Sequence, residues 1–378
     1  MIEKALAELT LNITDGKHGD CRGKDDSGYY FISCKDIREG QIHYEDARQI
    51  IEEDFWDAHK RTRLEPDDIL VTNSGTIGRM AFVRDVPLTY RTTFQKSVAI
   101  VKPDKAKIFP KYLYYQLQNC VDDFINRSNG AAQKNLLLST MRAFKMNIHE
   151  DEDLQMHIAA ILSAYDDLIE NNQKQIKLLE EAAQRLYKEW FVDLRFPGHE
   201  TTPIVDGVPE GWENASVTDL LEIRYGKDHK GLADGCIPVY GSGGIMRKVD
   251  KILYSGESVL IPRKGSLNNI LLVSGDFWTI DTMFYSVPKR PNVAKYVYLY
   301  LTGIDMYAMN IGAAVPSMSV KILDGMRLLC PSDSILELFE TTAKPYYEMI
   351  ELLKKKQSML GETRDRLLPK LMNREIEV

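Results

Sequence analysis

The chain has 378 residues, of which 27% are charged and 44% are hydrophobic. This globular composition excludes a disordered or fibrous chain and, at roughly 100–200 residues per domain, predicts two or three domains. No stretch approaches the roughly 18 consecutive apolar residues of a membrane-spanning helix. Residues 1–11 also lack the apolar core of a secretory signal, so we expect a cytoplasmic protein with no membrane partner.

The cysteines and the charge narrow the class further. Five widely spaced cysteines indicate reduced thiols rather than a disulfide framework or a metal site. Much of the net charge of −7 arises in residues 150–190, which carry 4 Lys and Arg against 10 Asp and Glu. The other segments are close to neutral, so either could present a basic face to nucleic acid.

The sequence contains an internal repeat, which indicates a duplicated architecture. Residues 67–78 (DDILVTNSGTIG) parallel residues 257–268 (ESVLIPRKGSLN), and Gly130-Ala131-Ala132 recurs as Gly312-Ala313-Ala314. Residues 16–18 (GKH) resemble residues 226–229 (GKDH) near the front of each copy. A long helical pattern follows each Gly-Ala-Ala.

The repeat predicts four segments in chain order. These are a globular unit over residues 1–149, a long helix over 150–194, a linker with a second globular unit over 195–333, and a second long helix over 334–378.

Both globular units mix strand and helix signals. In the first unit, residues 98–101 have the apolar, β-branched character of a strand, whereas residues 110–124 follow a helical pattern. In the second unit, residues 258–261 and 269–273 are typical of strands, and residues 294–302 are typical of a helix. We therefore expect an α+β fold with two mixed units in tandem.

Apolar residues recur at alternating steps of three and four through both long helices, as in a coiled-coil seam. Acidic residues 150–153 favour the start of the first helix, and Pro197-Gly198 follow its end. In the second helix, Ser334 is the expected N-cap, Pro345 should kink the helix or mark its start, and Pro369 should end it. We expect the two seams to pair. The expected interface residues are Leu154, Ile158, Ile161, Tyr165, Leu168, Asn172, Ile176, Leu179, Leu186, Leu336, Phe339, Tyr346, Ile350, Leu353, Leu360 and Leu367.

Two features near these seams allow alternatives. Asn172 on the apolar face favours a buried residue that fixes helix register, although it could also bind a ligand. The aromatic residues Trp190, Phe191 and Phe196 could form a partner-binding patch or pack where the first helix meets the second unit.

The chain has no recognisable catalytic motif. A GxxxxGK[ST] loop, a GxGxxG turn, an HExxH zinc motif and a GxSxG elbow are all absent from the sequence. The chain also lacks Pro-Pro, and no Glu-x-Lys follows shortly after its Pro-Asp dipeptides, which argues against base methyltransferase and nuclease signatures. We therefore expect no catalytic residue and no metal site.

The polar, glycine-containing loops of the repeat are the best candidates for a binding surface. Arg and Lys side chains can bond to guanine, Asn and Gln to adenine, and Ser, Thr and Lys to phosphates. One such loop alone would more often be a hairpin tip. The same loop carrying different polar residues is what two recognition units for different sequences would need. The candidate DNA-binding residues in these loops are Asn73, Ser74, Thr76, Arg79, Arg263, Lys264, Ser266, Asn268 and Asn269.

Further candidates lie in the Gly-Lys segments, after the first Gly-Ala-Ala and around residues 241–248. Each of these segments could equally be a solvated loop. The residues are Lys17, His18, Arg22, Gln133, Lys134, Asn135, Lys227, His229, Lys230, Ser242, Arg247 and Lys248. Because Val315-Pro316-Ser317 replaces Gln-Lys-Asn after the second Gly-Ala-Ala, these two loops should read different bases or only phosphate.

Three segments resemble the specificity subunit of Type I restriction–modification systems. They are residues 179–200 (LEEAAQRLYKEWFVDLRFPGHE), the second-unit opening at residues 208–213 (VPEGWE) and the closing residues 366–372 (RLLPKLM). The first unit departs from the pattern because it lacks a Pro-Glu-Gly-Trp opening.

This resemblance implies two target recognition domains, each reading one half of a bipartite site in double-stranded DNA. It implies that an antiparallel coiled coil with pseudo-twofold symmetry separates them and sets their spacing. Two methyltransferase subunits would bind the chain and methylate adenine, and ATP-dependent restriction subunits would join to cut DNA. The chain itself would hold no cofactor, whereas S-adenosylmethionine, ATP and Mg would bind to the partner subunits.

Two other interpretations remain open. A coiled-coil adaptor whose globular units bind proteins would also suit the near-neutral charge of both units. A divergent enzyme with a site assembled across the two units is the third possibility.

Overall fold

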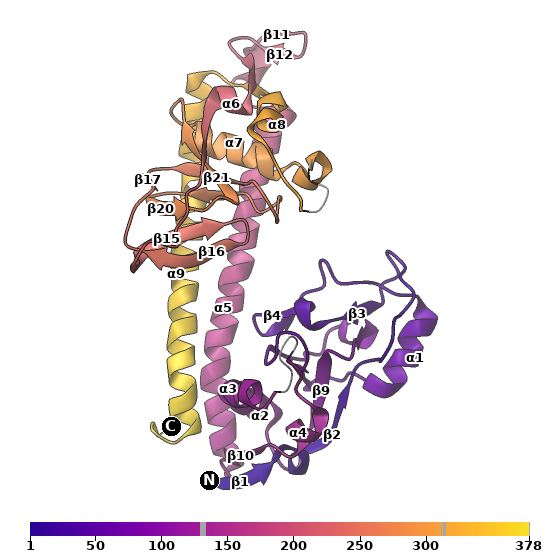
Figure 1. The fold of residues 1–378 in the computed structure, drawn as a ribbon. Helices are drawn as coiled ribbons and strands as arrows, with labels where there is room; N and C mark the ends of the chain where they lie inside the picture. Colours follow the sequence, from indigo (N-terminus) through magenta and orange to yellow (C-terminus); the bar gives the residue numbers. More distant parts are fainter. Residues whose placement is uncertain (129–133, 311, 313–314, 378) are drawn as a thin grey trace. The chain divides into compact units, whose positions relative to one another are not determined.

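The computed structural model describes residues 1–128, 134–310, 312 and 315–377 (Figure 1). The chain forms two compact units: unit 1 comprises Met1–Asn171 with Gln357–Val378, and unit 2 comprises Asn172–Lys356. Each unit therefore contains one globular part together with a length of both long helices. The repeat in the sequence instead predicts separate segments for the two long helices. Within the described ranges, no helix combines the length and apolar character required to cross a bilayer.

A four-stranded antiparallel sheet forms the centre of unit 1, in the order β2-β9-β6-β7. Alternate side chains of its strands enter two different cores, as the two-residue period of a strand requires. Ile69 and Val71 of β6 pack in the core that includes Tyr112, whereas Leu70 packs in the core that includes Phe94. The four strands are β2 (Thr10–Asp15), β6 (Ile69–Thr72), β7 (Met80–Phe82) and β9 (Val98–Pro103).

The remaining elements of the first globular part surround this sheet. Strand β1 pairs antiparallel with β10 and β4 with β5, whereas β3 pairs parallel with β8. The strands are β1 (Ile2–Ala5), β3 (Tyr30–Ile32), β4 (Ile37–Arg38), β5 (Gln41–Ile42), β8 (Thr92–Phe94) and β10 (Lys145–Ile148). The helices are α1 (Glu52–Thr62), α2 (Pro110–Asn119), α3 (Val121–Asn126) and α4 (Leu138–Arg142), with 3-10 turns at Leu6–Glu8, Cys34–Asp36 and Thr89–Arg91.

Unit 2 repeats the central sheet with the same strand order, β14-β21-β18-β19, and all its pairs are again antiparallel. The outer pair of unit 1, β1 with β10, also has a counterpart in β13 with β22. The repeat read from the sequence is therefore a structural repeat. The strands are β13 (Glu213–Ser216), β14 (Leu221–Tyr225), β18 (Ser258–Pro262), β19 (Leu271–Val273), β21 (Met283–Pro288) and β22 (Arg327–Cys330).

A second sheet of unit 2, in the order β16-β15-β20-β17, extends a parallel pair, β15 with β20, that corresponds to β3 with β8 in unit 1. Its strands are β15 (Asp234–Gly241), β16 (Gly244–Val249), β17 (Tyr254–Ser255) and β20 (Asp276–Thr279). The linker forms a short hairpin of β11 (Ile204–Val205) and β12 (Val208–Pro209). The shorter helices are α6 (Val217–Leu220), α7 (Val293–Thr302) and α8 (Val320–Gly325), with 3-10 turns at His199–Thr201 and Met306–Met309. These elements confirm the expected α+β class.

The two long helices are α5 (Glu152–Tyr187), extended by a π-helical turn at Lys188–Val192, and α9 (Asp333–Met372). They lie side by side in Figure 1. In unit 1, Arg364 of α9 contacts Asp166 of α5, and Leu371 lies near His149, just before α5. The later residue of the first segment, Asp166, contacts the earlier residue of α9, Arg364, so the two helices are antiparallel.

Helix α5 begins at Glu152, inside the acidic cluster of residues 150–153, and Asp151 accepts a hydrogen bond from the backbone N–H of Asp153 at 3.0 Å. The end points of α9 differ from the predictions. Ser334 lies inside the helix, and Ser332 is the last residue before it. The helix is continuous through Pro345, and it passes Pro369 to end at Met372. The carbonyl of Pro369 still accepts a hydrogen bond from Asn373 N–H at 2.9 Å, which sustains the last turn.

Most of the expected interface residues are buried or half-buried, and Asn172 is 1% exposed. Leu168 is an exception in the predicted interface, because 43% of it remains exposed. Trp190, Phe191 and Phe196 are buried in the core of unit 2, where the Phe196 ring centre lies 4.8 Å from that of Trp212. This arrangement supports the packing interpretation of the three aromatic residues.

Candidate nucleic-acid interface

In unit 1, the loop after β6 is held by main-chain hydrogen bonds to two other segments. Asn73 N–H donates to Ser97 O at 3.0 Å, and Leu136 N–H donates to Asn73 O at 2.8 Å. Gly75 N–H donates to Lys134 O at 3.2 Å, with Gly75 at φ +81°. We call residues 73–79 and 134–136 the first loop pair. The structure thus brings two predicted candidate segments together.

The loop after β18 in unit 2 makes the same contacts. Arg263 N–H donates to Thr282 O at 2.8 Å, and Met318 N–H donates to Arg263 O at 2.9 Å. Gly265 N–H donates to Pro316 O at 2.9 Å, with Gly265 at φ +89°. We call residues 263–269 and 316–318 the second loop pair. Asn73 and Arg263 therefore occupy corresponding positions, as do Lys134 and Pro316.

The two Gly-Lys segments also correspond. A Cβ atom on Gly16 would lie 2.1 Å from Phe94 O, and one on Gly226 would lie 2.0 Å from Ile280 O, so neither position accommodates a side chain. The next residue donates its N–H in both units, Lys17 to Phe94 O and Lys227 to Thr279 O, each at 2.8 Å. Close backbone approach therefore explains the repeated glycine.

The first loop pair exposes several of its polar side chains. Thr76, Arg79, Lys134 and Asn135 are exposed and Ser74 is half-buried, so all five could reach a ligand. Asn73 is only 5% exposed, and its Oδ1 has no hydrogen-bond partner. Gln133 lies outside the described residues.

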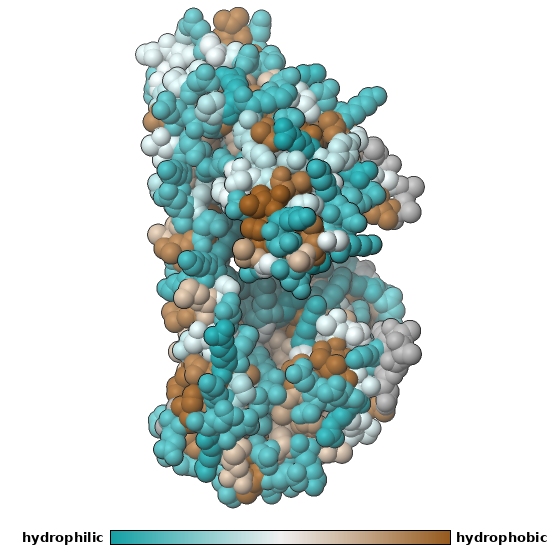
Figure 2. Space-filling view, turned by 60° about the vertical axis from the view of Figure 1, so that its left-hand side comes forward, coloured by the Kyte–Doolittle hydropathy of each residue, from teal (hydrophilic) through white to brown (hydrophobic). Residues whose placement is uncertain are grey.

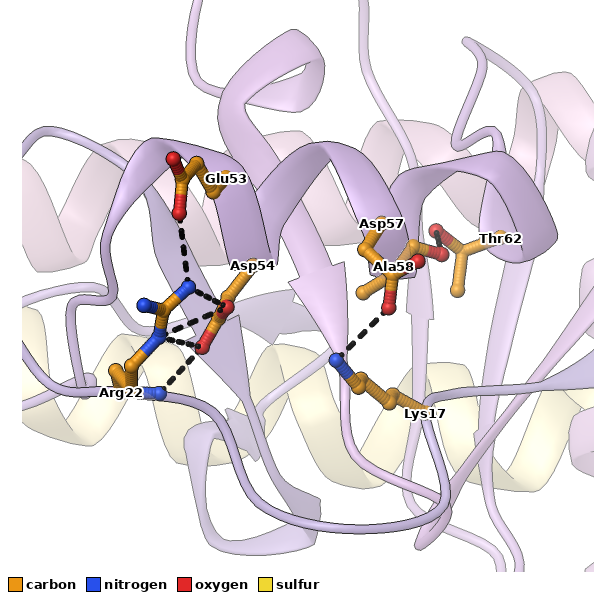
Figure 3. A network of polar contacts seen from close by, with 7 residues as sticks. All are labelled: Lys17, Arg22, Glu53, Asp54, Asp57, Ala58 and Thr62. Carbon is orange, nitrogen blue, oxygen red and sulfur yellow. Dashed lines mark hydrogen bonds and ion pairs between the residues drawn. The ribbon is translucent and has the colours of Figure 1, made fainter.

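The cations of the segment after β2 are already engaged within unit 1 (Figure 3). Arg22 bonds to Asp54 at 2.8 Å and to Glu53 at 3.0 Å, and Lys17 bonds to Asp57 at 3.0 Å. The three carboxylates lie on α1. The pKa of Asp54 falls to about 2 because its carboxylate accepts hydrogen bonds from the Arg22 side chain and backbone.

His18 is similarly paired, with Nε2 2.9 Å from the Asp15 carboxylate. Lys17, His18 and Arg22 remain predicted DNA-binding residues. Because Lys17 and Arg22 already pair with carboxylates, a phosphate would have to compete with these contacts.

In the second loop pair, some side chains support the loop rather than face solvent. Asn268 Nδ2 donates to Asp305 Oδ1 at 3.1 Å, and Asn269 Nδ2 donates to Ser242 O at 2.8 Å. Lys264 Nζ lies 3.8 Å from Asp281 Oδ2, and Ser266 is exposed. The side chains of Asn268 and Asn269 therefore hold the loop in place. To contact a base, either residue would have to use donors or acceptors that these hydrogen bonds leave open.

The remaining candidates of unit 2 differ in exposure. Lys227, Lys230 and Lys248 are exposed, whereas Arg247 bonds to Asp234 at 2.8 Å. The Nδ1 atom of His229 is buried without a hydrogen-bond partner. The three lysines therefore offer charge that a phosphate could reach.

Two residues of these loops escaped the sequence analysis. Lys96 is exposed, and its N–H donates to Lys17 O at 3.2 Å, which places it beside the first loop pair. Its counterpart in unit 2 is Asp281, because Ser97 and Thr282 accept equivalent hydrogen bonds. The offset of 190 residues between the repeated loops pairs Lys96 with Ser286, so this reversal of charge is visible only from the matching hydrogen bonds.

The molecular surface in Figure 2 is mainly hydrophilic, with hydrophobic residues gathered in several patches. Exposed apolar residues of unit 2 include Ile245 and Met246 on β16. Among the residues that the structure describes, no group of three or more His, Cys, Asp or Glu side chains could hold a metal ion. All five cysteines are free thiols.

Comparison with known proteins agrees with this duplicated fold. Residues 21–181 match the family described as Type I restriction modification DNA specificity domain. The MjaIX specificity subunit of Methanocaldococcus jannaschii is 26% identical over 344 residues, covering 82% of this chain and 78% of that protein. The HindI specificity subunit of Haemophilus influenzae is 20% identical over 366 residues, covering 73% and 80%.

The solved S subunit of a Type I system from M. genitalium has a TM-score of 0.54 at 16% identity, covering 98% of this chain and 96% of that one. The fold is therefore that of a two-unit S subunit, with a repeated sheet and two long helices. Over most of its length the chain is therefore similar to specificity subunits of Type I restriction–modification systems.

Proposed function

We propose that this chain is the non-catalytic DNA sequence-recognition subunit of a Type I restriction–modification complex, and that each unit reads one half of a bipartite target. The observation that carries the proposal is the correspondence of the two loop pairs. Their main-chain contacts match, yet Asn73 and Ser74 in one unit stand where Arg263 and Lys264 stand in the other. One backbone with different polar side chains suits two readers of different sequences.

The remaining parts of the complex follow from this proposal. Two methyltransferase subunits dock on the chain and its helix pair and methylate adenine, and ATP-dependent restriction subunits join them. S-adenosylmethionine, ATP and Mg bind to those partners, and this chain binds no cofactor. The absence of a recognisable catalytic motif from the sequence supports this division of roles.

The charges of the loop pairs and of the segment after β2 predict weak DNA binding by the chain alone. Lys17 and Arg22 face carboxylates of α1, and Lys264 lies near Asp281. Arg79 and Lys134 are exposed cations of the first loop pair. Because phosphate contacts supply much of the affinity for DNA, we expect the partner subunits to contribute many of them.

The proposal is tested by co-expressing the full chain with the methyltransferase subunit of its own system in a host without adenine methylation. Sequencing then maps methylated adenines, and a split motif with a fixed nonspecific gap is the expected result. A host strain carrying the methyltransferase subunit alone is the control and should show no such motif. A stable complex that methylates no bipartite motif contradicts the proposal.

A protein-binding adaptor is the second candidate, favoured by the exposed Ile245 and Met246. The salt dependence of DNA binding distinguishes the adaptor from the DNA-recognition subunit. DNA binding by the purified complex should weaken steeply between low and physiological salt, because neutralised phosphates release counterions. An adaptor would show little DNA binding at any salt concentration.

A further inference from the structure

The side chains of Tyr225 and Arg263 form a contact at the edge of the second loop pair. Tyr225 is the last residue of β14, and 56% of it is exposed. The guanidinium carbon of Arg263 lies 5.3 Å from the centre of the Tyr225 ring, within the range of a cation–π contact. The Tyr225 ring is itself supported by the buried Phe284, whose ring centre lies 5.1 Å away, edge to face.

A second contact fixes the guanidinium from another side. Its Nη1 donates a hydrogen bond to the backbone oxygen of Asp281 at 3.1 Å. The Asp281 carboxylate instead lies 3.8 Å from the Nζ of Lys264. Arg263 therefore has a defined orientation, while its remaining N–H donors stay available to a ligand.

A surface hollow of about 260 Å³ adjoins this pair. It is lined by the two aromatic rings, the two cations and Ser317, Met318 and Ser319. Flat rings beside an oriented guanidinium provide both an apolar wall and a planar set of donors. A planar base can contact both the aromatic rings and the guanidinium of this hollow. A phosphate would use the positive charge but would gain nothing from the aromatic rings.

Guanine is the base that matches these donors. It presents the acceptors O6 and N7 in the major groove, and Arg contacts them with two parallel N–H groups. Adenine presents N7 beside a donor, so one Arg N–H would remain unpaired. At the corresponding position of unit 1, Asn73 is 5% exposed, so this arrangement is specific to unit 2.

Building on the proposed function, we propose that Arg263 reads a guanine in the half-site of unit 2 and that Tyr225 is the positioning residue that orients Arg263. Removing the Tyr225 ring then relaxes the same base position as changing Arg263 does. A residue that only supported the fold would affect all positions of the target alike.

The test uses the full chain in complex with the methyltransferase subunit, with the methylated motif mapped for each variant. Tyr225→Phe retains the ring and should leave the motif unchanged. Tyr225→Leu and Arg263→Lys should reduce discrimination by about tenfold at one guanine of one half-site and leave the other half-site intact. Arg224→Lys is the matched control, because the neighbouring strand residue points to the opposite face and should change nothing.

Three results would overturn the inference. These are a wild-type motif without guanine in one half-site, variants that retain full discrimination, and a uniform loss of methylation at every site, which would indicate a phosphate contact. Thermal unfolding of each variant identifies a loss of folding, and Arg263→Lys still tests the guanine contact if Tyr225→Leu unfolds. If the wild-type complex methylates no bipartite motif, the proposed function itself fails together with the inference.

Discussion

The ammonium nitrogen of Lys295 on α7 lies 2.7 Å from Oε1 of Glu340 on α9. A second carboxylate, that of Glu257, lies 2.5 Å from the same nitrogen, and the Lys295 side chain is 9% exposed. Burial acts to lower the pKa of Lys295, but its hydrogen bonds to the two glutamates raise it above its usual value. The charged form is therefore retained and joins the globular part of unit 2 to the helix.

We expect Lys295→Ala to lower the free energy of unfolding by about 3–5 kcal/mol, because it leaves two carboxylates without their cation. Denaturant unfolding followed by circular dichroism measures this change. Lys344→Ala is the matched control. Lys344 is 61% exposed and only pairs with Glu348 one turn away at 3.7 Å, so its loss should cost less than about 0.5 kcal/mol. Equal effects of the two variants would contradict the prediction.

The contact between Arg22 and Asp54 predicts a specific acid titration. The pKa of Asp54 lies at about 2 in the folded chain against an ordinary value of 3.8. The contact is therefore complete above about pH 4 and is lost as the pH falls toward 2. Carbon-13 NMR of labelled aspartate should show this low midpoint, and Arg22→Ala should return it toward 3.8. A wild-type midpoint near the ordinary value would show that the two side chains are not paired in solution.

The exposed cations of the first loop pair should contact phosphate rather than bases. We expect Arg79→Ala and Lys134→Ala each to weaken DNA binding by the complex for all sequences alike. Each substitution should also reduce the slope of log affinity against log salt by about one. Arg22→Ala is the control and should change the slope less, because α1 already neutralises that charge. Affinity measured at several salt concentrations decides between these outcomes.

The close approach at Gly226 predicts strong sensitivity to a single methyl group. Because a Cβ atom there would lie 2.0 Å from Ile280 O, Gly226→Ala should displace the backbone and cost about 1–3 kcal/mol of stability. A Cβ atom on Gly243 would instead have no neighbouring atom within 4 Å, so Gly243→Ala should leave thermal unfolding unchanged. If Gly226→Ala unfolds at the wild-type temperature, the backbone of this loop does not approach Ile280 so closely in solution.

The repeat and the helix pair were predictable because their signals are local and periodic. Heptad spacing located α5 and α9, and the loop repeat located both loop pairs. The sequence contains a further repeat, in which Lys111-Tyr112-Leu113-Tyr114 corresponds to Lys295-Tyr296-Val297-Tyr298, with Tyr112 and Tyr296 both buried.

Contacts between distant segments could not be predicted in this way. Arg22 meets Asp54 across 32 positions, and Arg263 meets Tyr225 across 38, and neither spacing belongs to a periodic pattern. The sequence therefore revealed which residues are polar but not which polar residues are already satisfied by one another. Pro369 shows a similar limit, because its effect on α9 depends on which carbonyls find donors near the helix end.

The two loop pairs share contacts made by main-chain groups, which nearly every amino acid supplies, and in unit 2 the side chains of Asn268 and Asn269 add further support. Pro316 can replace Lys134 because only the carbonyl at that position is used. Substitutions on these loops therefore change the chemical surface at little cost to folding. A lineage carrying such a chain could alter the exposed side chains of these loops one at a time while the main-chain contacts persist. The same scaffold is thereby open to rapid evolutionary divergence.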